Sequence, residues 1–299
     1  MTQYGAIEAG GTKFVCAVGA GPDQIVDTVR IDTTTPDHTL NEVIEFFRHH
    51  QTTTTLAALG IGSFGPIDLD RNSSTYGHIT STPKSGWAQT DLAGLLGKRL
   101  GIPVGFDTDV NAAALGEHRW GAAQDVDSFI YLTIGTGIGG GAMIGGHLIH
   151  GLLHPEMGHI LVPPDARDTD FGGVCPFHGT CLEGLASGPA IEQRWGQPPH
   201  ELDASHPAWE LQAHYLARGL WTLTCALSPQ RLILGGGVME QAHLLPMVRS
   251  DLQKVSAGYL QADELDGEIT KFVVSPGLGD RAGICGALAL ADLAYHQDS

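Results

Sequence analysis

Apolar and polar positions along the chain predict strands that alternate with helices. Residues 4–18 are two apolar runs separated by Ala9-Gly10-Gly11-Thr12, which is the pattern of a β-hairpin, and a third strand is expected at 24–32. Apolar residues recur at helical spacing within 37–50, and an apolar run at 56–63 predicts another strand.

The next stretch changes from loop to helix. A polar loop begins at Gly65-Pro66 and continues through 83–87, after which Asp91 is expected to cap a helix ending at Leu100. A short strand at 104–106 then precedes a helix over 109–117 that is rich in alanine, the strongest helix former.

The second half repeats the pattern of the first. A strand at 128–133, a glycine-rich tip at 135–141 and a returning strand at 142–149 predict another hairpin. Helices are expected at 188–195, 209–227 and 284–295, and strands at 231–234 and 272–275, with a helix after the glycines at 235–237. Helices alternating with strands, entered by antiparallel hairpins, predict an α/β fold with mixed sheets and a boundary near 116–123.

Composition narrows the class of protein. A chain of 299 residues can hold two domains, and 41 glycines indicate many tight turns. The net charge of -17 argues against nucleic acids and anionic membranes as partners. No apolar run reaches about eighteen residues and no signal peptide is evident, so a cytoplasmic protein is expected, with Cys16, Cys225 and Cys285 as reduced core residues.

A cluster of metal-ligand residues lies in a polar loop of the second half. Cys175, His178 and Cys181 follow at spacings of three, and His159 lies upstream. Thiolate and imidazole suit zinc, and four protein ligands leave no open position for catalysis, so we expect a structural zinc ion. The alternative is two buried cysteines beside incidental histidines. Glu156 and Glu183 bracket this loop, and we expect these carboxylates to bind substrate.

The two hairpin tips are candidate phosphate-binding sites. Glycine backbone amides can surround an anion, and hydroxyl or ammonium groups add donors; the candidates are Gly10, Gly11, Thr12, Lys13, Thr133, Gly135, Thr136 and Gly137. A glycine hairpin can also be only a turn. The P-loop and dinucleotide-binding motifs do not fit, because a strand rather than a helix follows each tip.

Three further features suggest kinase chemistry. Asp109 begins a helix and is the candidate general base, although Asp109 or Thr108 could instead only cap that helix. Glu8 lies beside the first tip, where a carboxylate needs Mg²⁺ or its water between itself and a phosphate, or is simply a surface acid. The glycines Gly235, Gly236 and Gly237 permit close approach of a purine or ribose, or of another part of the chain.

Taken in order, these motifs resemble the ROK family of sugar kinases. The resemblance rests on Glu8-Ala-Gly-Gly-Thr-Lys13, 109–117, 134–141, Glu156-x-Gly-His159, the Cys/His loop ending in Glu183, and Leu234-Gly-Gly-Gly237, and it spans residues 4 to about 290. Within the family the chain is similar to zinc-containing bacterial fructokinases, which share the first motif and a loop like Pro83–Trp87.

The resemblance implies an actin-like ATPase (ribonuclease H-like) fold with two lobes. The lobes would be residues 1–117, with a C-terminal helix at about 282–299 packed on them, and 118–281, with the zinc-binding loop at 159–181. ATP and Mg²⁺ would be held by the tips, with adenosine near 235–237. Asp109 would take the proton of the fructose 6-hydroxyl, and Thr108, Glu156, His159 and Glu183 would contact the sugar. The family also implies a homodimer.

The chain departs from the common family pattern at three places. Many members have Asp at the position of Glu8 and Asn at that of Thr108, which makes glucose less expected as substrate. The usual third metal cysteine is replaced by His178, and His154 is a possible substitute ligand. A hexokinase or mannokinase of broader specificity, a non-catalytic sugar sensor and a DNA-binding repressor remain as alternatives. The repressor is disfavoured because the first hairpin begins at residue 4 and the charge is negative.

Overall fold

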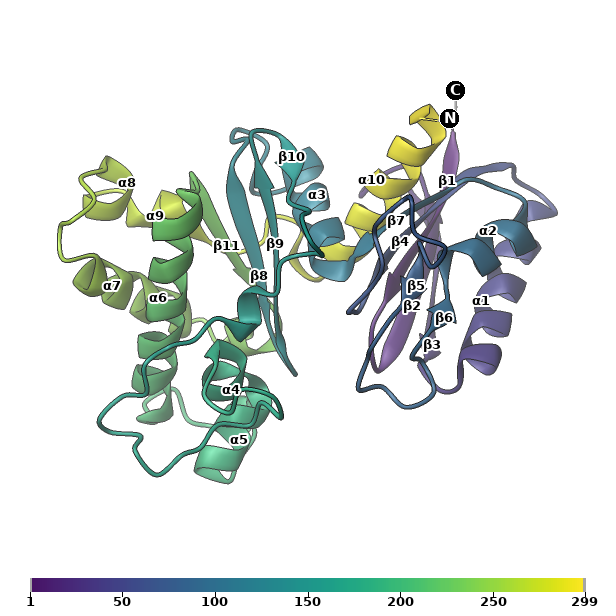
Figure 1. The fold of residues 1–299 in the computed structure, drawn as a ribbon. Coiled ribbons are helices and arrows are strands. Elements are labelled where there is room, and N and C mark those ends of the chain that lie inside the picture. The colour runs from purple at the N-terminus through teal and green to yellow at the C-terminus, as the bar shows by residue number, and fades with distance from the viewer. Residues whose placement is uncertain (1, 298–299) are drawn as a thin grey trace. The chain divides into compact units, whose positions relative to one another are not determined.

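The structure is a computed structural model that describes residues 2–297. The chain forms two compact units. Unit 1 contains residues 2–124, Leu148–Pro155 and 280–297, and unit 2 contains Asp125–His147 and Glu156–Gly279. Figure 1 labels the elements of both units.

Unit 1 is built on a mixed sheet with strand order β3-β2-β1-β4-β7. Its strands are β1 (Gln3–Ala9), β2 (Lys13–Gly19), β3 (Ile25–Asp32), β4 (Leu56–Ser63) and β7 (Val104–Thr108). β1 pairs antiparallel with β2 and parallel with β4, which in turn pairs parallel with β7. The first predicted hairpin and the next two strands are therefore confirmed.

The two faces of this sheet carry side chains of different size. On β4, Leu59 and Ile61 join the large-residue core with Phe47 of α1 (Pro36–Gln51), and α2 (Ala93–Leu100) contributes Leu96 to that core. Gly60, between them, faces α10 (Ala282–Gln297), where a Cβ would lie 2.6 Å from the backbone nitrogen of Ala291. Strand alternation thus gives one face for bulky packing and one for close approach of a helix.

Helix α10 is buried along most of its length. It contacts β1, β4, β7 and α3 (Asp109–Trp120), and its buried residues are mainly alanine and leucine. Figure 1 shows α10 and α3 on one face of the sheet and α1 and α2 on the other. The predicted C-terminal helix at 282–299 is present as far as Gln297, and positions 298 and 299 lie outside the described residues.

Unit 2 is built on a second mixed sheet, with strand order β10-β9-β8-β11-β12. Its strands are β8 (Phe129–Ile134), β9 (Ile138–Ile144), β10 (His147–Leu148), β11 (Arg231–Gly235) and β12 (Val273–Val274). Its α-helices are α4 (Leu182–Ala186), α5 (Gly188–Trp195), α6 (Ala208–Leu227), α7 (Leu244–Ser256), α8 (Asp263–Asp266) and α9 (Ile269–Phe272). The predicted α/β fold with mixed sheets is confirmed.

Short elements complete the chain. A two-stranded sheet of β5 (His78–Ile79) and β6 (Thr90–Asp91) lies in the loop of unit 1. The 3-10 helices are η1 (Met157–His159), η2 (Pro199–Glu201), η3 (Gly237–Glu240) and η4 (Gly279–Arg281). Among residues 2–297, no helix combines the length and apolar character that a membrane crossing requires.

Three local predictions were wrong. The second hairpin tip is only Gly135–Gly137, because residues 139–141 pair within β9. The helix expected to follow Asp91 as its N-cap begins at Ala93 with Leu92 at the N-cap position, although it ends at Leu100 as predicted and the Asp91 carboxylate accepts a hydrogen bond from the Gly94 N–H. Cys225 is exposed rather than buried, since it lies near the end of α6 on the side of exposed Thr222.

Candidate functional site

Asp109 is the first residue of α3, directly after the end of β7. The helix is capped by Thr108, whose hydroxyl accepts a hydrogen bond of 3.0 Å from the Asn111 N–H. Thr108 therefore performs the capping that the sequence left open between the two residues. Asp109 is placed in the first helical turn, where the helix dipole favours a negative charge.

Register places the first glycine tip and Asp109 on the same edge of the sheet. Ala9 pairs with Ser63, and Ser63 pairs with Thr108. Three parallel strands thus end side by side, with the tip following the first strand and Asp109 following the third. Neighbouring strands are about 4.8 Å apart, so Ala9 and Thr108 lie roughly 10 Å from each other. Ligands commonly bind at this edge in α/β sheets.

The first tip is held by its own backbone and by Thr33. The Gly10 N–H donates to Lys13 O at 3.0 Å, the Thr33 N–H donates to Thr12 O at 3.0 Å, and the Thr33 hydroxyl donates to Gly10 O at 2.8 Å. Gly11 has nothing within 4 Å of its Cβ position. The tip is therefore fixed at its base and open at Gly11.

Glu8 is half-buried in unit 1. A Cβ on Gly283, at the start of α10, would lie 2.5 Å from the Glu8 carboxyl carbon. Burial raises the pKa of Glu8, Lys13 opposes that shift and Asp280 adds to it. A carboxylate in such a position gains stability as an anion when a cation is near.

The second tip lies beside the glycines that follow β11. Thr133 pairs with Gly235, and the Gly188 N–H donates to Gly135 O at 2.8 Å. Gly236 has φ +90°, and a Cβ there would lie 2.6 Å from the Ile134 nitrogen, so this position requires glycine. The predicted residues at 133–137 and 235–237 thus share one edge of the second sheet.

Four predicted metal ligands come together in unit 2. Ligand atoms of His159, Cys175, His178 and Cys181 all lie within 4.8 Å of one another. His159 Nδ1 is 3.7 Å from Cys175 Sγ and 3.5 Å from Cys181 Sγ, and Cys175 Sγ is 3.7 Å from His178 Nδ1. Zinc bonds of about 2.0–2.3 Å in a tetrahedron give sulfur–nitrogen distances of about 3.6 Å, so the cluster fits this ion. Burial raises the pKa of the Cys181 thiol to about 11, so its thiolate needs a cation.

The possible substitute ligand does not belong to this cluster. His154 lies in unit 1, where its Nε2 accepts a hydrogen bond of 3.1 Å from the Ile67 N–H.

Both predicted substrate carboxylates lie at the ends of this loop. Glu156 immediately precedes η1, and its carbonyl accepts a hydrogen bond from the His159 N–H at 3.0 Å. Glu183 is in the first turn of α4, two residues after Cys181, and its Oε2 accepts from the Ile138 N–H at 2.9 Å. His159 directs Nδ1 toward the sulfur atoms, which leaves Nε2 for another partner.

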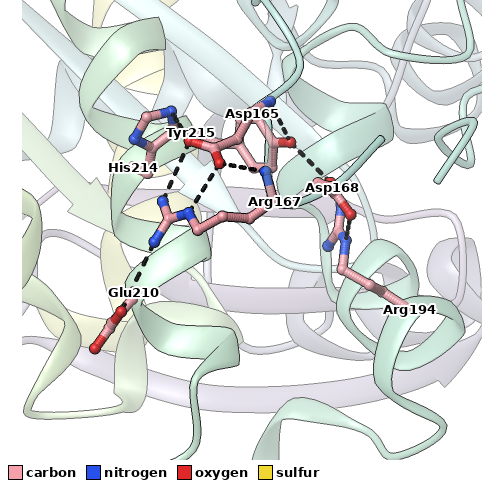
Figure 2. Close-up of polar contacts among 7 residues, drawn as sticks. All are labelled: Asp165, Arg167, Asp168, Arg194, Glu210, His214 and Tyr215. Carbon is pink, nitrogen blue, oxygen red and sulfur yellow. Dashed lines mark hydrogen bonds and ion pairs between the residues drawn. The ribbon is translucent and has the colours of Figure 1, made fainter. Parts of the chain in front are cut away.

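A polar network anchors the loop between His159 and Cys175 (Figure 2). Arg194 Nε donates to Asp168 Oδ1 at 2.9 Å, and both side chains are less than a tenth exposed. The Tyr215 hydroxyl donates to Asp168 Oδ2 at 2.7 Å and accepts from the Asp165 N–H at 3.0 Å. Burial, with the hydrogen bond to Asp168, raises the pKa of Tyr215 to about 12. The metal-site loop is therefore tied to α5 and α6.

Sequence reasoning missed a second polar cluster, beside Asp109. The Asp107 carboxylate accepts hydrogen bonds from the Thr108 N–H at 2.7 Å and the Asn111 side chain at 2.8 Å through Oδ1. Its Oδ2 accepts from His150 Nε2 at 2.8 Å. The sequence showed Asp107 close to Asp109, but no local pattern could indicate a partner 43 residues away.

Comparison with known proteins identifies the family of this chain. The ROK family model matches residues 4–293. The chain is 45% identical to a fructokinase of Zymomonas mobilis, over 96% of both chains. It is 44% identical to a fructokinase of Pediococcus pentosaceus, over 97% of this chain and 98% of that one.

Solved structures that are similar to this chain belong to the same family. A ROK hexokinase from Thermus thermophilus is 28% identical, with TM-score 0.79 and 100% of both chains covered. A ROK glucokinase from Streptomyces griseus, solved with glucose and AMPPNP, is 27% identical with TM-score 0.77, over 97% of this chain and 99% of that one. This chain belongs to the ROK family, and its fold is that of the actin-like sugar kinases, as predicted.

Proposed function

We propose that this chain is an ATP-dependent fructokinase that phosphorylates the 6-hydroxyl of D-fructose. The names of the Zymomonas mobilis and Pediococcus pentosaceus relatives support the sugar, and the AMPPNP bound to the Streptomyces griseus glucokinase supports the nucleotide. A hexokinase of broader specificity is the second candidate, favoured by the name of the Thermus thermophilus relative.

The observation that carries the proposal is the shared sheet edge in unit 1. The Gly10–Lys13 tip and Asp109 follow strands whose ends are in register across β1, β4 and β7. A phosphate held by the tip and a hydroxyl held at Asp109 would therefore both lie at one edge of the sheet of unit 1. A kinase needs this pairing of an anion cradle with a carboxylate base.

Asp109 would accept the proton of the sugar hydroxyl as the oxygen attacks the γ-phosphorus of ATP. A new oxygen–phosphorus bond forms, the bond from the γ-phosphorus to the β,γ-bridging oxygen breaks, and ADP leaves. The proton resides on the Asp109 carboxylate until it passes to solvent. Thr108 would contact the sugar next to the base, and Glu156, His159 and Glu183 would bind its other hydroxyls.

The nucleotide would lie against backbone amides of both tips. Gly10, Gly11, Thr12 and Lys13 would bind phosphate in unit 1, and Thr133, Gly135, Thr136 and Gly137 in unit 2, with adenosine near Gly235–Gly237. Mg²⁺, when bound, neutralises charge on the β- and γ-phosphates. Glu8 is the residue we assign to it, since its half-buried carboxylate, whose pKa is raised, is stabilised as an anion by a cation.

The Cys/His cluster would hold one structural zinc ion. His159, Cys175, His178 and Cys181 supply all four ligands of a tetrahedral ion, so no position remains for a substrate. The ion would fix both ends of the loop that carries Glu156 and Glu183. We further propose that the protein is a cytoplasmic homodimer. Each chain would have the two lobes predicted from the sequence.

Replacing the base tests the function. Asp109→Asn should lower kcat by about a thousandfold or more while leaving fructose binding nearly unchanged, because the amide cannot accept the proton. Turnover is measured as ADP release and binding by calorimetry. A variant that keeps the wild-type rate would show that Asp109 is not the base.

A further inference from the structure

A segment of unit 1 leads directly into Glu156. This segment, Leu148–Pro155, is termed the histidine strap. Apart from Leu148 at the end of β10, it has no regular secondary structure. Leu152 is 100% exposed and Leu153 is 59% exposed, so these two residues do not hold the strap to the unit by apolar burial.

His150 attaches the strap to the junction between β7 and α3. Its Nε2 donates to Asp107 Oδ2 at 2.8 Å, and the Asp107 carboxylate is buried and held by Thr108 and Asn111 through its other oxygen. The acceptor is therefore rigid, and it lies two residues before Asp109. Among the described residues, the other ring nitrogen of His150 makes no hydrogen bond.

His154 attaches the strap at a second place. Its buried ring accepts the hydrogen bond from the Ile67 N–H, and a Cβ on Gly65 would lie 3.3 Å from its Cε1. Ile67 and Gly65 belong to the loop that follows β4, the strand between β1 and β7. Two imidazoles thus fix the strap to the end of β7, which Asp109 follows, and to the loop after β4, the strand beside it.

We propose that His150 is a positioning residue for the phosphoryl-transfer site: by pairing with Asp107 it fixes the strap to the β7–α3 junction, which carries Thr108 and Asp109. This inference rests on the proposed function. The ion pair would then hold the junction that carries the proposed base and its neighbour Thr108. Small displacements of groups that orient a substrate have large effects on its binding and reaction.

The pairing also makes sugar binding depend on pH. The hydrogen bond to Asp107 raises the pKa of His150 above its usual 6.5, against a smaller opposing effect of burial. Asp107 is the charged group that faces the ring among the described residues, and Asn111 is its uncharged neighbour. Because the folded pKa is raised, the pair is strongest below it and weakens as the pH rises through it.

His150→Gln tests the proposal, with His147→Gln as the matched control. His147 is an exposed histidine three residues earlier whose Nδ1 lies 2.9 Å from the Gly145 carbonyl oxygen. His150→Gln should raise the KM for the sugar about tenfold or more, with the KM for ATP within about twofold of wild type. The wild-type KM for the sugar should rise between about pH 6 and pH 9, and this rise should be absent in His150→Gln.

Asp107→Asn provides a second test of the pair. If the two residues act together, the double variant should be no worse than the more affected single variant. Asp107 is buried, so its substitution can also destabilise the fold. His150 is partly exposed, so the His150→Gln variant is the decisive test of the pair. A wild-type KM and pH profile in folded His150→Gln would overturn the proposal.

Limited proteolysis separates this inference from the proposed function. Freeing one end of the strap should accelerate cleavage at Leu152-Leu153 several-fold in His150→Gln and not in His147→Gln. An unchanged cleavage rate would overturn the anchoring role whether or not the enzyme turns over. A wild type that phosphorylates no sugar, but shows faster cleavage in His150→Gln, would contradict the proposed function and leave the anchor supported.

Discussion

The carboxylate of Glu183 accepts a hydrogen bond of 2.9 Å from the backbone N–H of Ile138, the first residue of β9. Ile138 immediately follows the Gly135–Gly137 tip, and Glu183 follows Cys181 by two residues. One hydrogen bond therefore joins the proposed phosphate tip to the proposed metal loop within unit 2. A ligand that orders one of them should also order the other.

Glu183→Gln should weaken sugar binding more than it disturbs the fold. The amide oxygen can still accept from Ile138, but the charge that strengthens hydrogen bonds to sugar hydroxyls is lost. We expect the KM for fructose to rise roughly 10- to 100-fold, as for loss of a hydrogen bond to a charged group. Glu192→Gln, at an exposed acid on α5, is the control, and equal KM values for both variants would remove Glu183 from the sugar site.

Cys181→Ser should remove the metal and lower stability. Wild-type protein should contain about one zinc per chain and the variant far less, with a thermal midpoint lower by about 10 °C or more. Cys225→Ser changes an exposed thiol outside the cluster and should alter neither quantity. Metal-free wild-type protein with unchanged stability would contradict a structural zinc ion.

Glu8→Gln should raise the stability of the protein and weaken its use of Mg²⁺. Because burial raises the folded pKa of Glu8, the protonated form favours folding, and this contribution is lost as the pH rises from about 4.5 through the raised value. At neutral pH without Mg²⁺, the glutamine variant should unfold a few degrees higher than wild type. It should also need more Mg²⁺ for half-maximal turnover, whereas Glu45→Gln, at an exposed acid on α1, should change neither.

Asp168→Asn should destabilise the loop that leads to the metal cluster. The substitution leaves Arg194 as a buried cation without its partner, which typically costs about 3–5 kcal/mol. Thermal unfolding and zinc retention in a chelator measure the effect. Asp170→Asn, two residues away and exposed, should behave as wild type. Similar thermal midpoints for the two variants would show that the Asp168 network does not stabilise the loop.

The sequence predicted those features that depend on local pattern. The first hairpin, helix α5 and strand β4 follow from alternation, helical spacing and glycine turns. The four metal ligands were predicted because three of them lie within seven residues, and the structure brings the fourth, His159, to them. The short helix α4 was missed, since five residues give too little periodicity to identify a helix.

Features that depend on distant contacts could not be predicted. Asp107 and His150 are far apart in sequence, as are Asp168 and its partners Arg194 and Tyr215, and none of these residues belongs to a motif. The second tip was predicted too long because glycines suit turns and also strands that are closely approached. A Cβ on Gly140, for instance, would lie 2.7 Å from the Met157 side chain.

The most direct test of the proposed function is ADP release from ATP and Mg²⁺ with fructose, glucose, mannose and N-acetylmannosamine as acceptors. We expect turnover on fructose, with a kcat/KM at least about tenfold above that of any other sugar, since hydroxyl-specific contacts discriminate strongly. Preference for another sugar would contradict the fructokinase assignment while keeping Asp109 as base. Absence of ADP release with every sugar, in folded protein that still binds fructose, would contradict the kinase assignment itself.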